Sequence, residues 1–499
     1  MKMPKSIYNW VSISGFILAV NSLVVILILF LFSWFSKESN SYMGLFIYIV
    51  VPAFLVLGLL LIPIGMIIKR RKKVATVESA GKWPILDMNL KFQRTALVRV
   101  SIITVILLII SSIGSYQAFH YTESVEFCGT LCHDVMEPEY VTYQHSAHAK
   151  VKCVECHVGE GAGWYVKSKL SGLYQVYSVA FKKYPRPIAT PLHNLRPASE
   201  TCEKCHWPEK FYSQKLRNQR SYLADSSNTE WDISLLMKIG PEQSAHGLSE
   251  GIHWHINKDY KIEYASSTKD RENIPWVKLT NVKTGEVKIY MDEENPVEQA
   301  ALDTLEMRSM DCMDCHNRPS HIYKSAPDYI DQALIAGKIP NDIPYIKYAA
   351  MQALKLPYET TMNAHREIYA AVVGFYKDEH PDVYLKEFNR IQKAIKVIQA
   401  EYDDNVFPYM KADASQYLNH IGHLESQGCF RCHSDRHKTD KGEVISKTCE
   451  NCHDILAQGP KNNIQTVSLQ KTMEFLHPVD IRDAWKSAMC SDCHRVLYE

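Results

Sequence analysis

Residues 153–157 read Cys-Val-Glu-Cys-His, and the pattern Cys-x-x-Cys-His occurs six times in this 499-residue chain. A seventh motif, at 128–133, has three residues between its cysteines. At these frequencies of Cys and His, roughly 0.02 such motifs would arise by chance. The motif cysteines, which are all 14 in the chain, are Cys128, Cys132, Cys153, Cys156, Cys202, Cys205, Cys312, Cys315, Cys429, Cys432, Cys449, Cys452, Cys490 and Cys493. The histidines that directly follow them are His133, His157, His206, His316, His433, His453 and His494.

The spacing is typical of covalent haem attachment. Two thiols at this separation attack the two vinyl groups of one haem, and the next imidazole is then held under the iron. Zinc binding and disulfide formation are the alternatives for paired cysteines, but neither requires a histidine after every second cysteine. The sequence therefore predicts seven covalently attached c-type haems, the first through a motif whose wider gap must still reach both vinyl groups.

Three apolar stretches precede the first cysteine: about Trp10–Phe35, Met43–Ile68 and Leu97–Ser115. Each approaches the roughly 20 apolar residues that cross a bilayer. A cleaved signal peptide is the alternative for the first stretch, but the stretch is too long and no small-x-small cleavage site follows it. We therefore expect three transmembrane helices.

Basic residues predict the orientation of these spans. The run Lys69–Lys73 lies between the second and third stretches, whereas Ser36–Tyr42 holds one Lys and one Glu. The positive-inside rule then puts the N-terminus in the cytoplasm and everything after residue 117 outside. Haem attachment outside the bacterial cytoplasmic membrane agrees, so we expect a multi-pass inner-membrane protein with periplasmic haem domains.

Charge separates the two parts of the chain. Residues 1–120 hold 12 Lys and Arg against 3 Asp and Glu, whereas residues 121–499 hold 44 against 52. The outer part is therefore acidic, which disfavours nucleic-acid binding. The basic run between two spans is also improbable as a nucleic-acid site.

A low-spin haem that transfers electrons needs a second strong axial ligand, usually His or Met. A histidine close in sequence to a motif is usually too strained to cap its own haem, so it more often caps a neighbour. Between the third and fourth motifs His246, His253 and His255 are the candidates, and we select His253; His365 and His380 are expected to be surface histidines. The predicted distal ligands are His148, His253, His321, His423, His437 and His477, with Met136 as a further candidate at the first haem.

The predicted fold is mainly α with large loop content. We expect a membrane domain at 1–118, a tetrahaem domain at 119–325 with a β-rich insertion at about 207–307, a helical connector at 326–408, and a trihaem domain at 409–499. In the insertion, period-two alternation in Trp276–Leu279 and Val287–Tyr290 predicts a hairpin, and His253–Ile256 and Tyr260–Ala265 are further candidate strands. Apolar periodicity in Ile346–Leu356 and Phe388–Ile398 predicts helices. In 410–499 apolar residues are few, so haems should form the core among loops and short helices.

The first two motifs resemble the NapC/NirT/NrfH family of membrane-anchored cytochromes that oxidise quinol. The resemblance rests on the runs at 127–140 (Phe-Cys-Gly-Thr-Leu-Cys-His-Asp-Val-Met-Glu-Pro-Glu-Tyr), 145–150 (His-Ser-Ala-His-Ala-Lys) and 153–158, and it covers about 120–206 and 308–325. Three spans and three additional C-terminal haems make the chain similar to the seven-haem ImcH-type inner-membrane cytochromes of metal-respiring bacteria. The segment Asn419-His420-Ile421-Gly422-His423 before the fifth motif is similar to their C-terminal part.

The resemblance implies roles for individual residues. Met136 matches the methionine that can ligate haem 1 in place of the motif histidine, His148 the distal ligand of haem 4, and His321 that of haem 2. Lys169 matches a lysine at the quinol site. Gln175 stands where the family has an acidic residue, and an amide cannot accept a quinol proton.

The predicted function is therefore menaquinol oxidation with electron relay to a periplasmic multihaem cytochrome in anaerobic or extracellular respiration. The enzyme would be a quinol dehydrogenase, with the membrane lipid and the menaquinone pool as its surroundings. Two alternatives remain open: an electron-transfer subunit that a partner membrane protein feeds, and a terminal reductase with one open haem.

Overall fold

The computed structural model describes residues 8–35, 50–74, 88–159, 162–192, 195–211, 213–240, 251–302, 304–469 and 471–495. The chain divides into two compact units. Unit 1 comprises Met1–Met136 with Lys152–Val154, and unit 2 comprises Glu137–Val151 with Glu155–Glu499.

In its described residues, unit 1 contains three long helices, α1 (Trp10–Phe35), α3 (Val51–Val74) and α4 (Lys91–Thr122). Within the described residues, two segments are long and apolar enough to cross a membrane, Trp10–Leu29 and Val51–Lys69, with mean hydropathies of 2.5 and 2.7. The helix α1 has the bounds predicted for the first apolar stretch, whereas residues 43–49 of the second stretch and the loop 36–42 lie outside the described residues. The third stretch lies within α4, and its role as a third span stays a prediction.

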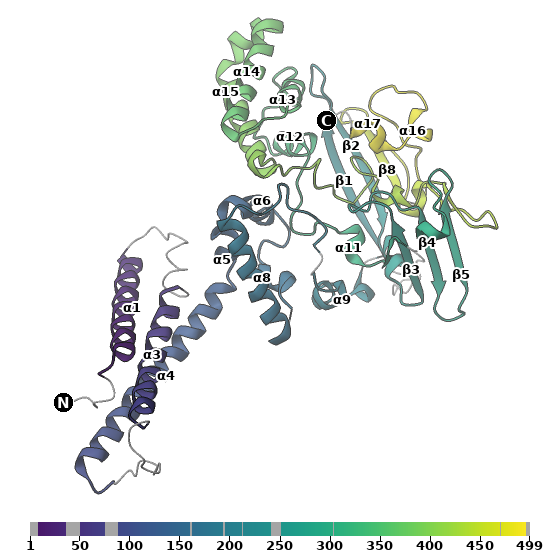
Figure 1. The fold of residues 1–499 in the computed structure, drawn as a ribbon. Coiled ribbons are helices and arrows are strands. Elements are labelled where there is room, and N and C mark those ends of the chain that lie inside the picture. Colours follow the sequence, from purple (N-terminus) through teal and green to yellow (C-terminus); the bar gives the residue numbers. More distant parts are fainter. Residues whose placement is uncertain are drawn as a thin grey trace. The chain divides into compact units, whose positions relative to one another are not determined.

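Helices α1 and α3 lie side by side (Figure 1) because small residues allow a close approach. A Cβ atom on Gly15 would lie 2.7 Å from the carbonyl oxygen of Gly58, and one on Gly58 would lie 2.6 Å from the backbone nitrogen of Ala19. The hydroxyl of Ser12 donates a hydrogen bond of 2.8 Å to the carbonyl of Ile62. Small residues and interhelical hydrogen bonds are characteristic of helix pairs in membranes.

Unit 2 contains a helical bundle in the region predicted to be helical. Its helices are α12 (Ala326–Ile335), α13 (Ile346–Leu354), α14 (Thr361–Glu379) and α15 (Pro381–Asn405). Ile330, Ile346, Ile368, Ile391 and Ile395 are fully buried where these helices pack. The apolar period of 3.6 residues thus produces a conventional hydrophobic core here.

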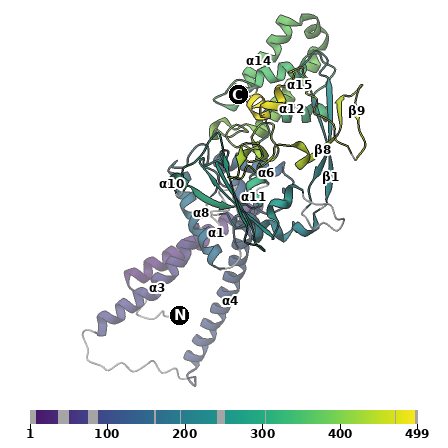
Figure 2. The same cartoon turned by 90° about the vertical axis from the view of Figure 1, so that its right-hand side faces the viewer.

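Two antiparallel sheets form the rest of the ordered framework of unit 2 (Figures 1 and 2). The five-stranded sheet has the order β6-β3-β4-β5-β7, and the four-stranded sheet has the order β1-β2-β8-β9. The bounds are β1 Gln214–Tyr222, β2 Glu230–Lys238, β3 Tyr260–Ser266, β4 Trp276–Asn281, β5 Val287–Asp292, β6 Glu306–Ser309, β7 His437–Lys438, β8 His453–Pro460 and β9 Gln465–Thr466.

The predicted hairpin is confirmed, since β4 pairs with β5 and Trp276 lies opposite Met291. The predicted strand at His253–Ile256 is wrong, because Ile252–Ile256 forms the 3-10 helix η4. The sequence patterns did not predict β8, which belongs to the C-terminal part of the chain yet pairs with β2. Each sheet therefore combines strands from 207–307 with strands from the last 65 residues or so.

The seven motifs lie on short helical turns that carry few apolar residues. These elements are α5 (Val125–Thr130), α6 (His133–Gln144), α7 (Cys153–His157), α9 (Ala198–Thr201), η2 (Cys202–Lys204), α11 (Cys312–Cys315), η6 (Gly428–Arg431), η7 (Cys449–Asn451) and α17 (Cys490–His494). The remaining short elements are η3 (Pro208–Lys210), α10 (Gln299–Leu302), η5 (Pro408–Met410) and α16 (Ala484–Ser487), and one longer helix, α8 (Ala162–Ala180), separates the second and third motifs.

Candidate haem-attachment sites

One helical turn brings each motif's reactive groups together. The backbone N–H of His206 donates to the carbonyl of Cys202, and that of His316 to the carbonyl of Cys312, each at 2.8 Å. Residues three and four apart on a turn lie on the same side. All fourteen cysteines are free thiols. The local structure therefore presents two thiols and one imidazole toward the same space.

Six motif histidines each face a second histidine from elsewhere in the chain, with ring centres 5.8–6.4 Å apart. Two imidazoles that bind one metal ion from opposite sides, through nitrogens at about 2 Å, have ring centres roughly 6 Å apart. The six pairs are His157–His321, His206–His148, His316–His253, His433–His255, His453–His423 and His494–His477. The side chains thus fit six irons with two axial histidines each.

At six of the twelve paired rings a carbonyl lies at Nδ1, which orients the ring for ligation through Nε2. The Nδ1 atom of His253 lies 2.8 Å from the carbonyl of Ile239, and that of His148 lies 3.1 Å from the carbonyl of Pro319. A carbonyl at Nδ1 fixes the proton there and leaves the Nε2 lone pair for a metal. The same arrangement holds for His255 with Ile252, His433 with Ser446, and His477 with Val479.

Burial favours the neutral form, which is the form that binds metal, at eight of the twelve paired histidines. Removal from water lowers the pKa of His423 to about 4. It also lowers the pKa values of His157, His253, His255, His316, His433, His453 and His494.

Of the six histidines predicted as distal ligands, five face a motif histidine and one, His437, does not. His253, His321, His423 and His477 each lie against a motif histidine, and so does His148. The partner of His148 is His206 of the third motif, however, and not His316 of the fourth, as the family resemblance implied. The ring that faces His316 is His253 instead.

The prediction of His437 as a distal ligand needs correction. Its Nε2 atom lies 2.7 Å from the carbonyl of Ile274, and the side chain is fully buried on β7. The ring opposite His433 is that of His255. His255 was among the sequence candidates, of which only His253 was predicted to be a ligand. The available signal was the spacing His-Trp-His, which in one 3-10 turn places one ring against the histidine of the fourth motif and one against that of the fifth.

Three other histidines have structural contacts. His420 is buried with Nδ1 3.3 Å from the carbonyl of Asp314 and Nε2 3.1 Å from the carboxylate of Glu272. His365 pairs with Asp403 at 2.8 Å, and His380 stacks on a tyrosine ring. His246, a further candidate of the sequence, lies outside the described residues.

The first motif differs from the others. The side chain of His133 lies outside what the structure describes, whereas Met136 is half-buried on the same helix, α6, three residues further on. Which of His133 and Met136 would bind the first haem therefore stays a prediction from the sequence.

The cysteine thiols show which motifs are neighbours. Cys153 of the second motif hydrogen-bonds to Cys128 of the first, which lowers the pKa of Cys153 to about 7. Cys202 of the third motif hydrogen-bonds to Cys312 of the fourth, which lowers the pKa of Cys202 to about 6. The first and second motifs are thus in contact, and so are the third and fourth.

The series continues through the last three motifs. Cys315 interacts electrostatically with Cys429, so the fourth motif adjoins the fifth. Cys429 likewise adjoins Cys452 of the sixth motif, and Cys449 adjoins Cys490 of the seventh. From the fourth motif to the seventh, each motif is therefore close enough to the next for their thiols to interact electrostatically.

A buried polar cluster locks the fourth motif to the fifth. Asp314, between the cysteines of the fourth motif, is 1% exposed and accepts hydrogen bonds from Tyr264 at 2.6 Å and Arg308 at 2.5 Å. Arg431, between the cysteines of the fifth motif, donates to the carbonyl of Asp314 at 2.8 Å and to that of Arg271 at 3.0 Å. The contact fixes two neighbouring attachment sites from inside their motifs.

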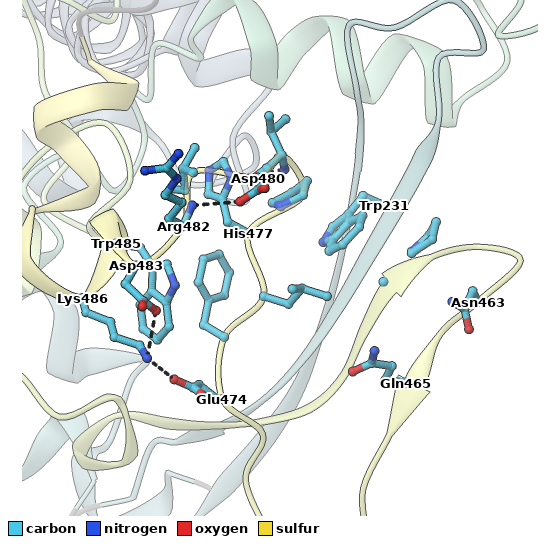
Figure 3. Close-up of a pocket in the computed structure, with 17 residues that line it drawn as sticks. Trp231, Asn463, Gln465, Glu474, His477, Asp480, Arg482, Asp483, Trp485 and Lys486 are labelled. Atoms are coloured by element: carbon cyan, nitrogen blue, oxygen red, sulfur yellow. Dashed lines mark hydrogen bonds and ion pairs between the residues drawn. The ribbon is translucent and has the colours of Figure 1, made fainter.

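A cavity of about 620 Å³ opens beside the seventh motif (Figure 3). Its walls include Trp231, Phe475 and Trp485, and they carry the distal histidine His477. Lys486 at its rim pairs with Glu474 at 2.8 Å and with Asp483 at 3.0 Å. Aromatic walls beside an axial imidazole suit a planar, apolar cofactor.

The two residues considered for a quinol site both lie exposed on α8 but are not together. Lys169 and Gln175 are six residues apart, which places them about 120° apart around the helix axis. The amide of Gln175 donates to the hydroxyl of Ser171 at 3.4 Å. A single ligand on one face of α8 would therefore contact one of the two.

Comparisons with known proteins agree with this site. Residues 91–229 match the model of the NapC/NirT cytochrome c family, N-terminal region. The chain is 42% identical over 495 residues to the cytochrome c-type protein ImcH of Geobacter sulfurreducens, covering 99% of this chain and 96% of that protein. It is 30% identical over 97 residues to the cytochrome c-type protein NrfH of Wolinella succinogenes, covering 19% of this chain and 54% of that one. No solved structure matches the chain. With motifs, paired histidines and apolar helices in agreement, the chain belongs to the NapC/NirT family of cytochromes c and is a membrane-anchored multihaem cytochrome of electron transport.

Proposed function

We propose that this protein oxidises menaquinol at the outer side of the bacterial cytoplasmic membrane and relays the electrons to a periplasmic multihaem cytochrome. The supporting observation is that each of six motif histidines faces a second histidine, and that neighbouring motifs interact from the third to the seventh. Attached c-type haems would supply one-electron carriers at these sites.

The residues of the chain have distinct tasks in this proposal. The six pairs of histidines would each hold a haem through two rings and leave no open iron, which suits electron transfer rather than reduction of a substrate. We place electron entry at the first motif, where His133 and Met136 are alternative candidate ligands. The four domains expected from the sequence, at 1–118, 119–325, 326–408 and 409–499, would then correspond to anchor, entry, connector and exit.

At the entry we propose that the Nζ atom of Lys169 contacts a quinol oxygen. Gln175 cannot accept a proton and lies on another face of α8, so the two quinol protons would pass to external water. At the exit, the acidic outer part favours a basic partner, since complementary charge speeds encounter and makes it dependent on salt. The orientation follows the basic run Lys69–Lys73, with the N-terminus in the cytoplasm.

Anaerobic addition of a menaquinol analogue to the purified full-length protein tests the proposal. We expect haem reduction, followed by absorbance, without any partner protein. A protein that stays oxidised, yet is reduced by dithionite, would instead be a subunit that a partner feeds. Lys169→Gln should slow reduction, whereas Lys167→Gln, a matched change two residues away whose ammonium lies 5.0 Å from the Trp164 ring, should not.

A terminal reductase would behave differently from either alternative. It would show a high-spin haem that binds carbon monoxide or nitrite in stoichiometric amount, because its reaction requires an open iron. Six histidine pairs leave the first motif as the place where such a signal would be sought.

A further inference from the structure

An apolar stripe runs along the exposed side of α8. Val166, Leu170, Leu173, Tyr174 and Tyr177 are 41–69% exposed, and Phe181 directly after the helix is 65% exposed. At 100° per residue these side chains fall within a sector about 100° wide. On the opposite side of α8, Gly172 and Val179 are half-buried, and Ser178 on the flank of the stripe is buried. The helix thus turns most of its large apolar residues outward.

The segment that carries this stripe has only basic residues among its charged side chains. Residues 161–199 contain six Lys and Arg and no Asp or Glu, within an outer part that has an excess of acidic residues. Lys183 donates to the hydroxyl of Tyr177 at 2.6 Å, and Lys167 lies 5.0 Å from the ring centre of Trp164. Lysines whose stems lie along aromatic rings keep their charges at the border of an apolar surface.

We propose that α8 lies in the outer surface of the lipid bilayer, with its apolar stripe among the acyl chains and its lysines at anionic headgroups. An amphipathic helix with aromatic and leucine side chains on one face and lysines beside them has this preference. Each basic residue near an anionic surface adds to this attraction. Two copies of the chain that met through α8 would bring like charges together, so a second copy is the less favourable occupant.

This inference is independent of whether quinol is the donor, because it concerns only the surface on which the haem part rests. In this position Lys169 would lie at the level of the membrane surface, where a lipid-soluble donor would arrive. The helix would then be both a membrane contact and one wall of the entry site.

Spin labelling in nanodiscs of phosphatidylglycerol tests the proposal on the holoprotein, in which the native cysteines are bound to haem. A nitroxide at Leu173→Cys should collide with oxygen, which concentrates in lipid, at least threefold more than with a water-soluble nickel chelate. Leu385→Cys is the matched control, because Leu385 is a 78% exposed leucine on α15. Its label should show the opposite preference.

Two outcomes would overturn the proposal. A label at Leu173→Cys that the nickel chelate reaches as readily as at Leu385→Cys would show that the stripe faces water. A label that neither reagent reaches would show that protein or haem covers the stripe. An unchanged haem spectrum establishes that each variant is folded, and haem reduction by the menaquinol analogue is measured separately, so the proposed function can fail while the lipid contact holds.

The charges have their own test. In the Leu173→Cys background, Lys182→Gln together with Lys183→Gln should reduce the preference for oxygen in phosphatidylglycerol nanodiscs at least twofold. In phosphatidylcholine nanodiscs the same substitutions should have no effect. An equal effect in both lipids would overturn the assignment of an anionic surface.

Discussion

The carboxylate of Glu139 lies 3.0 Å from Nδ1 of His321, the histidine that faces the second motif. The carbonyl of Glu139 lies 2.9 Å from the same nitrogen, and Tyr323 donates to the carboxylate at 3.1 Å. His148, His253, His255 and His477 have a backbone carbonyl at Nδ1 instead. A carboxylate partner makes an imidazole a stronger donor to its metal, and such second partners tune the site.

Glu139→Gln should therefore raise the reduction potential of one haem. The neutral amide is a weaker acceptor for the imidazole N–H than the carboxylate is, so the imidazole donates less electron density to the iron. The oxidised iron is then stabilised less. A tenfold change in that preference corresponds to about 59 mV for a one-electron couple. A spectroscopic redox titration measures the shift, and Glu137→Gln, an exposed neighbour on α6 with the same change in charge, is the control. Equal shifts in both variants would mean that the change in potential comes from the lost charge alone and not from the contact between Glu139 and His321.

His255→Ala should convert one haem from low spin to high spin. The structure places this ring 5.8 Å from His433, so its removal opens one axial position at the fifth motif. We expect a high-spin signal in electron paramagnetic resonance and binding of one carbon monoxide per protein. His437→Ala removes a buried histidine that hydrogen-bonds to Ile274 and should leave all haems low-spin. The reverse result would restore His437 as the ligand.

Asp314→Ala should destabilise the junction of the fourth and fifth motifs by about 3 kcal/mol, because it leaves Arg308 and Arg271 without their buried carboxylate. Asp232→Ala breaks a paired contact with Arg220 that is partly open to solvent, and it should cost less than about 1 kcal/mol. Denaturant unfolding in detergent, followed by the haem absorbance, compares the two. A similar loss in both variants would mean that the buried cluster has no special role.

Local patterns in the sequence predicted local structure well. The bounds of α1 follow from one uninterrupted apolar run, and the hairpin of β4 and β5 follows from alternation on both sides of a Lys-Thr-Gly-Glu turn. In α12 to α15 the apolar period suffices because side chains alone make the core. Each of these elements is determined within about 30 residues of sequence.

Pairings over long distances were not predictable in the same way. β8 reads as part of a loop because its partner, β2, lies more than 200 residues earlier. His148 and His206 meet across the second motif, and spacing alone cannot tell which of several nearby motif histidines a given ring will face. At η4, the alternation of His253, Trp254 and His255 suggested a strand, whereas the two outer rings are required at two different motifs.

The number of haems follows from the same reading and can be measured directly. The intact mass of the purified chain should exceed that of the polypeptide by seven haems. Replacing both Cys128 and Cys132 by alanine should leave six, because the wider first motif is then unable to form either thioether. Met136→Leu should keep seven, since it alters a candidate axial ligand and no thiol. A wild-type mass with six haems would show that the additional residue between Cys128 and Cys132 prevents attachment, and electron entry would then have to lie at the second motif.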